Sequence, residues 1–158
     1  MNPEEYLFNL EDRLMVGYGR WVADFNESFR DLQVGDTLYD MVLEGNMRPK
    51  GFLVSRFFAW IAMPAHQAAT FVVQSDANAS QVGTMRKDIQ DYMGERDLSW
   101  SWLVLLRQGP FTRKARLLVE KDKTRELGLA LVDLEAREIT HSRSYIGRRM
   151  PQFLKAFK

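Results

Sequence analysis

Apolar residues recur at helical spacing through the first third of the chain. Asn2-Pro3 followed by two glutamates is typical of a helix start. The apolar residues that follow fall on one helical face: Leu7, Leu10, Leu14 and Met15. The pattern resumes over residues 21–32, and Asp36 is a suitable N-cap for a further helix over 36–47. The N-terminal third is therefore predicted to be helical.

The rest of the chain alternates apolar runs, rich in β-branched and aromatic residues, with amphipathic stretches. Strands are predicted over residues 52–63, 70–75, 100–106 and 129–134, with a short hairpin partner at 137–141. Helices are predicted over 78–96 and 112–124, and from Pro151 onward. This order indicates an α/β fold with a mixed central sheet flanked by helices. We expect a single domain over residues 1–158, with a helical N-terminal segment (1–50) before an α/β core (51–158).

Composition excludes several classes of site. The chain has no Cys and two His, which excludes a disulfide framework, a thiolate zinc site and a cysteine nucleophile. No apolar run reaches the ~18 residues of a membrane span, and the acidic N-terminus is not a signal peptide. We therefore expect a cytoplasmic protein without membrane association, a permanent metal or another cofactor.

The net charge of +1 conceals a strong segregation of charge. Residues 1–50 hold ten carboxylates and five Lys or Arg. Residues 107–125 hold seven basic and two acidic residues, and residues 139–158 hold five basic residues and no carboxylate. Two basic segments in the C-terminal half can form one phosphate-binding surface if the fold brings them together. Solvated helix faces are the alternative.

Two stretches within these segments have the chemistry of phosphate binding. Residues 142–149 combine hydroxyls and a glycine with Arg143, Arg148 and Arg149, just before a predicted helix. Arg113 and Lys114 begin another predicted helix after Thr112. The alternatives are a surface loop paired with acidic neighbours for the first stretch, and plain helix capping by Thr112 for the second.

The order of motifs from residue 70 to residue 134 resembles a known family. A strand TFVVQSD is followed by a helix start SQVGTMRKDI, an apolar strand WSWLVLL, Phe111-Thr112, and the strand Gly128–Asp133. This order is similar to the second half of restriction-endonuclease-like domains of the Mrr type. The resemblance implies the mixed sheet of that fold and a nuclease ancestry.

The same resemblance implies an active site that this chain matches only in part. Such nucleases place a carboxylate on one strand and Glu or Gln followed by Lys, at positions i and i+2, on the next, where they bind a divalent ion. Gln74 matches the first position, whereas Asp76 stands where Lys belongs. Residues 45–75 contain no Asp or Glu, so the predicted strand over 52–63 supplies no metal ligand. Glu44 is the nearest carboxylate that could complete a site.

We therefore expect a catalytically degenerate nuclease-like domain that binds DNA or RNA, or supports a complex that processes them. Phosphate contacts are assigned to Arg113, Lys114, Arg143, Arg148 and Arg149. One alternative is an active Mg²⁺-dependent nuclease that uses Glu44, Gln74 and Asp76. Another is a non-enzymatic interaction module, a homodimer or part of a larger complex, that docks through its acidic N-terminal helices.

Overall fold

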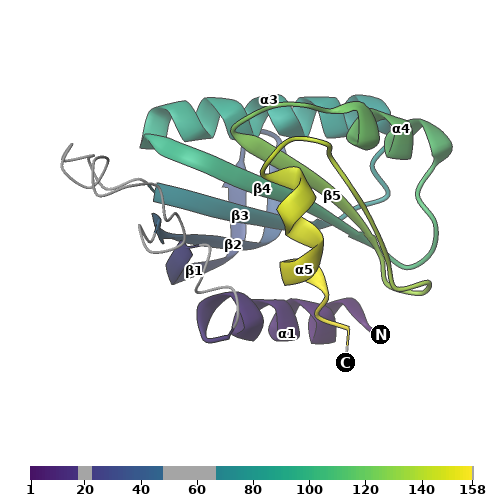
Figure 1. Cartoon of the computed structure of the whole chain (residues 1–158), viewed down its shortest axis with the longest axis horizontal. Coiled ribbons are helices and arrows are strands. Elements are labelled where there is room, and N and C mark those ends of the chain that lie inside the picture. The colour runs from purple at the N-terminus through teal and green to yellow at the C-terminus, as the bar shows by residue number, and fades with distance from the viewer. Residues whose placement is uncertain (18–22, 48–66, 158) are drawn as a thin grey trace.

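The computed structural model describes residues 1–17, 23–47 and 67–157. One mixed sheet of six strands organises the described chain, with the strand order β1-β2-β3-β4-β5-β6 (Figure 1). The strands are β1 (Ala23–Val34), β2 (Thr37–Met47), β3 (Gln67–Gln74), β4 (Leu98–Arg107), β5 (Leu127–Asp133) and β6 (Glu138–His141). The predicted α/β architecture is confirmed.

The sheet combines an antiparallel half with a parallel one. Strands β1, β2 and β3 form an antiparallel meander, whereas β3, β4 and β5 run parallel and β6 returns antiparallel to β5. The connections between the parallel strands pass through helices, because two adjacent parallel strands need a long crossover connection. All carboxyl ends of β3, β4 and β5 consequently meet at one edge of the sheet, and their amino ends meet at the opposite edge.

Helices cover both faces of the sheet. The helices in the described residues are α1 (Pro3–Met15), α3 (Ala79–Arg96), α4 (Arg113–Lys121) and α5 (Met150–Leu154), and a 3₁₀ turn, η3 (Gly147–Arg149), precedes α5. Figure 1 shows α3 and α4 over one face and α1 and α5 over the other. Side chains of β4 alternate accordingly, because Trp102 faces the α1/α5 cluster and Leu103 faces the α3/α4 cluster. None of the helices in these ranges combines the length and apolar character that a membrane crossing requires.

Most predicted elements are present where the pattern placed them. Asn2 caps α1 by accepting hydrogen bonds from the Glu4 and Glu5 backbone N–H groups, and Asn78 caps α3 through a capping box with Gln81. The predicted strands at 70–75, 100–106 and 129–134 correspond to β3, β4 and β5, and the 137–141 hairpin partner is β6. The strand predicted over 52–63 lies outside the described residues.

The predicted helix over 21–32 is wrong, because this segment forms the edge strand β1. Phe25, Phe29 and Leu32 have helical spacing, yet the strand changes face twice along its length. A bulge lies between Phe25 and Glu27, and Asp31 adopts a left-handed φ of 52°. Phe25 therefore packs in the α1/α5 cluster, whereas Phe29 and Leu32 pack against the α3/α4 cluster. The irregularities of β1 therefore give its apolar residues the spacing that is typical of a helix.

The predicted helix over 36–47 is also wrong, because this segment is β2. Gly35, at a φ of +56°, and Asp36 form a two-residue hairpin turn between β1 and β2, so Asp36 is a turn residue and not an N-cap. Buried side chains of β2 point to both faces: Tyr39 and Val42 toward α3, Met41 and Leu43 toward α1. A strand buried on both sides shows no simple alternation. Of the helical segment predicted over residues 1–50, only α1 is a helix in the described residues. The predicted docking face of acidic helices is therefore limited to α1.

The N-terminal helix holds the C-terminal segment in place. The Tyr6 hydroxyl donates to the Leu154 carbonyl at 2.7 Å, and the Arg13 guanidinium donates to the Phe153 and Gln152 carbonyls at 3.0 and 2.9 Å. These groups satisfy carbonyls at the end of α5 that have no partner within the helix. The two ends of the chain therefore lie close together (Figure 1).

Candidate functional site

Gln74 and Asp76 lie at the carboxyl edge of the parallel strands. Gln74 is the last residue of β3, and the Asp76 side chain, two residues beyond, is 83% exposed. Asp76 Oδ1 lies 3.0 Å from Nε of Arg107, the last residue of the neighbouring strand β4. The position that holds Lys in the nuclease motif is thus occupied by a carboxylate that already has a cationic partner.

A second acidic residue, Asp40, joins this edge from the neighbouring strand β2. The pairing of β2 with β3 ends at Met41 and Val72, and the Asp40 carboxylate accepts the Gln74 backbone N–H at 2.5 Å. The side chain thus takes the place of a strand carbonyl where the two strands part. The helix predicted over 36–47 hides Asp40, because it places this residue outside the sheet. The Gly35-Asp36 pair, a hairpin signal, could have identified the strand.

Glu44 does not join Gln74 and Asp76. It lies opposite Ala69, five residues before Gln74 on β3, which corresponds to roughly 16 Å along an extended strand. Its buried carboxylate accepts the Tyr92 hydroxyl at 2.5 Å and lies 3.6 Å from the Arg96 guanidinium. Burial, reinforced by the Glu44 carboxylate, raises the pKa of Tyr92 above its ordinary value of 10.0. The three proposed catalytic residues therefore do not form one cluster.

A small polar hollow lies beside Glu44. It is lined by residues of three adjacent strands: Asn26, Glu27, Glu44, Gly45, Asn46 and Gln67. Glu27 and Glu44 face each other across β1 and β2. Tyr92 and Arg96 already engage Glu44 from α3. Among the described residues, no group of three or more Asp, Glu or His side chains is arranged to hold a metal ion.

Arg113 and Lys114 begin α4, near the carboxyl edge of the sheet. Both side chains are exposed, and Thr112 caps the helix by accepting the Ala115 backbone N–H at 3.3 Å. The predicted cap is confirmed. The helix is nine residues long, or about 13 Å. Arg113 and Lys114 are therefore separated by the length of α4 from Lys121 at its C-terminal end.

The serines of the loop before η3 are structural. Ser142 Oγ accepts the Leu129 backbone N–H at 3.0 Å, and Ser144 Oγ accepts the Gly147 N–H at 3.0 Å. Both serines are buried. Gly147 packs so closely against Ser142 that a Cβ would collide with it, so close approach is the reason for this glycine. The hydroxyls predicted to face phosphate therefore bind the backbone, while the Arg143 side chain points to solvent.

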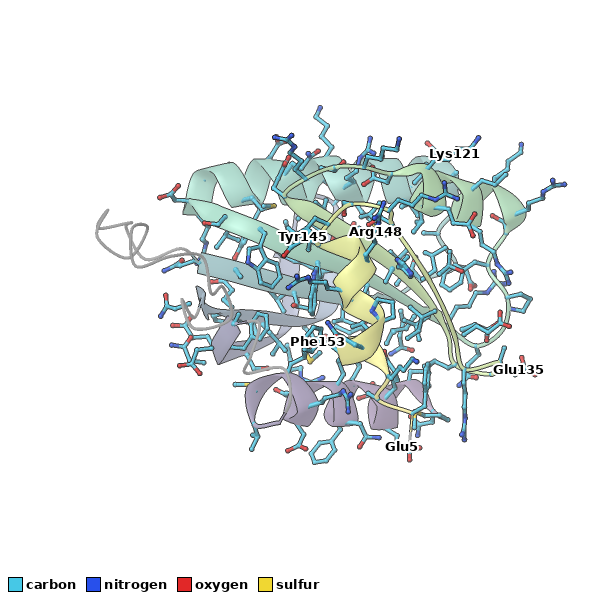
Figure 2. The ribbon with its side chains drawn as sticks, viewed as in Figure 1. Glu5, Lys121, Glu135, Tyr145, Arg148 and Phe153 are labelled. Atoms are coloured by element: carbon cyan, nitrogen blue, oxygen red, sulfur yellow. The ribbon has the colours of Figure 1, made fainter. Side chains whose placement is uncertain are left out.

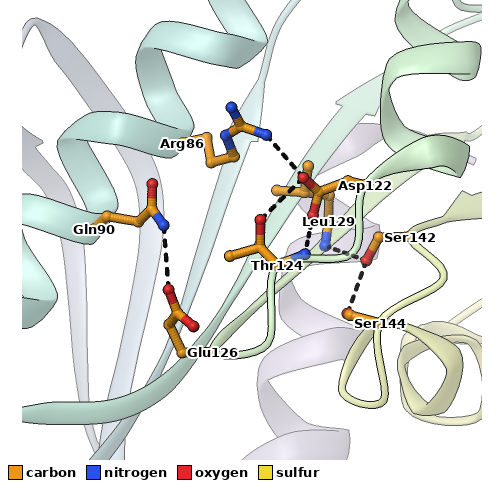
Figure 3. A network of polar contacts seen from close by, with 8 residues as sticks. All are labelled: Arg86, Gln90, Asp122, Thr124, Glu126, Leu129, Ser142 and Ser144. Atoms are coloured by element: carbon orange, nitrogen blue, oxygen red, sulfur yellow. Dashed lines mark hydrogen bonds and ion pairs between the residues drawn. The ribbon is translucent and has the colours of Figure 1, made fainter.

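The end of α4 and the loop after it present basic residues on alternate positions. Lys121, Lys123 and Arg125 are exposed, whereas Asp122 is buried and Thr124 half-buried. Asp122 Oδ1 accepts from Arg86 of α3 at 2.8 Å and from the Thr124 hydroxyl at 3.0 Å. Figure 3 shows these inward contacts, together with the 3.3 Å hydrogen bond from Gln90 to Glu126. The inward contacts to α3 fix the segment and leave its three cations pointing outward.

The loop before η3 is bonded directly to this segment. The Arg143 backbone N–H donates to the Asp122 carbonyl at 3.1 Å, so two regions about twenty residues apart in sequence meet at the amino edge of the sheet. In Figure 2, Lys121, Tyr145 and Arg148 lie in the upper half of the view, away from Glu5 and Glu135. We call the resulting surface the basic rim, which comprises Lys121, Lys123, Arg125, Arg143, Arg148 and Arg149.

Within the described residues, no carboxylate forms an ion pair with Lys121, Lys123, Arg143 or Arg148. Asp122, the buried acid between two of them, is neutralised by Arg86. The structure therefore joins Arg143, Arg148 and Arg149 with Lys121 and Lys123, which fall within the helix predicted over 112–124, and with Arg125 just after it; it separates them from Arg113 and Lys114. The alternation of basic with polar residues over 121–126 was the available sequence signal.

Comparisons of the chain with models of known protein families, with curated proteins and with solved structures found no match. What the protein does is therefore inferred from its own residues.

Proposed function

We propose that the protein binds nucleic acid through the basic rim, as a nuclease-like domain that has lost its metal site. The central support is the outward alternation of Lys121, Lys123 and Arg125 beside the Arg143–Arg149 loop. Lys121 ends α4, and Lys123 and Arg125 follow it in the loop that leads to β5, so three exposed cations lie close together on this connection. Arg113 and Lys114 add a second, smaller basic region at the other end of α4.

The internal bonding of the rim favours phosphate as its ligand. Asp122 accepts hydrogen bonds from the Arg86 guanidinium and from the Thr124 hydroxyl and backbone N–H, so the backbone that presents the cations is fixed before binding. Exposed guanidinium and ammonium groups make charge-assisted hydrogen bonds to phosphate oxygens, and they release counterions when they do so. Such contacts position a strand without reading its sequence.

The nuclease-like part of the proposal is supported at the carboxyl edge. The resemblance implies a carboxylate on one strand and Glu or Gln on the next, and Asp40 on β2 contacts Gln74 on β3. The motif Lys is replaced by Asp76, which is paired with Arg107. Substitution of this lysine removes the group that would orient the nucleophile, so we propose a degenerate site.

A metal-dependent nuclease that uses Asp40, Gln74 and Asp76 is the second candidate, because of the Asp40–Gln74 contact. The three side chains offer the oxygen ligands that Mg²⁺ prefers. They fit the ion poorly, however, since Asp40 is engaged by a backbone N–H and Asp76 by Arg107. Incubation of plasmid with Mg²⁺ or Mn²⁺ distinguishes the two candidates. Metal-dependent cleavage that is lost in both Asp40→Ala and Asp76→Ala would replace the degenerate site by an active one.

Binding itself is tested by fluorescence anisotropy of labelled DNA and RNA oligonucleotides at several salt concentrations. We expect affinity to fall linearly on a logarithmic scale between ~50 and ~200 mM salt, with a slope of about 0.7 to 0.9 per phosphate contact. Absence of measurable binding to either nucleic acid at ~50 mM salt would exclude the proposed function.

A further inference from the structure

An aromatic residue, Tyr145, lies within the basic rim. Its side chain is 56% exposed, although both neighbouring anchors of the loop, Ser142 and Ser144, are buried. Ser144 Oγ accepts the Gly147 N–H, and the Arg148 N–H donates to the Ser144 carbonyl at 3.0 Å. The backbone on either side of Tyr145 is therefore fixed, while its side chain stays more than half exposed.

The Tyr145 ring is supported by a cation of the rim. The guanidinium carbon of Arg149 lies 4.4 Å from the ring centroid, within the range of a cation–π contact. A ring held in this way loses little conformational freedom when a flat ligand stacks on it. The aromatic ring and the phosphate-binding cations are supplied by the same loop, since Arg143 and Arg148 flank Tyr145 in sequence.

We propose that the basic rim takes an unpaired nucleic-acid strand and stacks one base on Tyr145. The inference rests on the proposed function and narrows its ligand. Only an unpaired base exposes its face, because in a duplex both faces are covered by neighbouring base pairs. Lys121 at the end of α4, together with Lys123 and Arg125 in the loop after it, then contacts the phosphates of that single strand.

The test compares three probes by fluorescence anisotropy at ~50 mM salt. They are a labelled 15-nucleotide single strand, the corresponding duplex, and a strand of equal length made of abasic residues. The variants are Tyr145→Ala and Tyr145→Phe, with Phe8→Ala as a matched control at another exposed aromatic residue, 69% exposed on α1. Thermal unfolding of each variant verifies that it is folded.

We expect the single strand to bind more tightly than the duplex, and Tyr145→Ala to weaken single-strand binding roughly tenfold. Tyr145→Phe, which keeps the ring, retains wild-type affinity, as does Phe8→Ala. The abasic strand binds wild type and Tyr145→Ala equally, because it offers phosphates without bases. This last arm separates stacking from any rearrangement of the rim cations.

Two outcomes contradict the inference at different levels. Salt-dependent binding that is unaffected by Tyr145→Ala, or that is tighter for the duplex, overturns the stacking role and leaves the proposed function intact. Failure of all three probes to bind overturns the proposed function as well.

Discussion

The carboxyl and amino ends of the parallel strands differ in whether their charged residues have partners within the protein. At the carboxyl ends, Asp76 pairs with Arg107, Asp40 accepts a backbone N–H, and Asp133 accepts the N–H groups of the turn that follows β5. At the amino ends, the buried Asp122 is neutralised by Arg86, and the cations of the basic rim remain exposed. The first edge has its acidic groups engaged internally, while the second presents charge to a ligand.

The comparison shows that the number of charges in a segment does not decide what a surface can bind. The carboxyl edge has the residues that resemble a nuclease motif, but its carboxylates already have partners. The amino edge has no motif, yet its cations are exposed, and Lys121, Lys123, Arg143 and Arg148 form no ion pair with a carboxylate of the described residues. Availability of a charge depends on which groups the fold places next to it.

The largest expected effect is on nucleic-acid affinity when the rim charges are reversed. Lys121→Glu, Lys123→Glu and Arg125→Glu together should weaken binding at ~50 mM salt by about a hundredfold or more and lower the salt slope by roughly two to three units. Anisotropy titrations at four salt concentrations measure both quantities.

The matched control reverses Arg113, Lys114 and Arg116 at the other end of α4. It reverses the same number of charges at the N-terminal end of α4, so a purely long-range effect would weaken binding equally. An equal loss in the two variants would contradict the special role of the basic rim and would remove the contrast between the two edges.

The second effect concerns the buried acid beneath the rim. Asp122→Ala leaves Arg86 and the Thr124 hydroxyl without their acceptor and should lower the free energy of unfolding by about 2 to 3 kcal/mol. Urea denaturation measures the change. Binding should weaken too, because the segment that presents Lys121 and Lys123 loses its attachment to α3. Unchanged stability would show that this attachment is not what fixes the segment.

At the carboxyl edge, Asp40→Ala should have a smaller effect, about 1 kcal/mol, because it removes one acceptor from a partly exposed backbone N–H. Hydrogen exchange at the Gln74 amide should accelerate in proportion. Asp40→Asn retains a side-chain oxygen and serves as the control. Exchange at Gln74 that is equally slow in Asp40→Ala would contradict the bridging role of this carboxylate between β2 and β3.

The smallest effect is expected for Asp76→Ala. The ion pair with Arg107 involves a carboxylate that is 83% exposed, so its loss should change stability by less than about 0.5 kcal/mol. Nucleic-acid affinity should not decrease, since the variant removes a negative charge. A clear loss of affinity would show that ligand reaches the carboxyl edge, and the two edges would then act together.

Several elements could be predicted from the sequence because local interactions dictate them. The caps at Asn2, Asn78 and Thr112, and the apolar runs of β3, β4 and β5, identified their helices and strands within a few residues. Gln74 and Asp76 were correctly placed at the end of their strand.

The N-terminal strands could not be predicted in the same way. The bulge in β1 and the left-handed Asp31 interrupt the two-residue period, and β2 is buried on both faces. With that segment assigned to helices, Asp40 was missed and Glu44 was grouped with residues that lie roughly 16 Å away along β3. The tertiary environment of these strands, and not their local propensity, determines their conformation.

The sequence by itself determined the α/β class, the helix caps and the presence of two basic segments, because each depends on neighbours within a few residues. Only the tertiary structure decided which charges have partners and which segments meet. The hydrogen bond from the Arg143 N–H to Asp122 joins the basic segment 139–158 to the C-terminal end of the basic segment 107–125. Arg113 and Lys114 lie at the opposite end of α4, away from this junction. Contacts between segments distant in sequence depend on the crossover connections and the strand order of the sheet, which no local sequence pattern encodes.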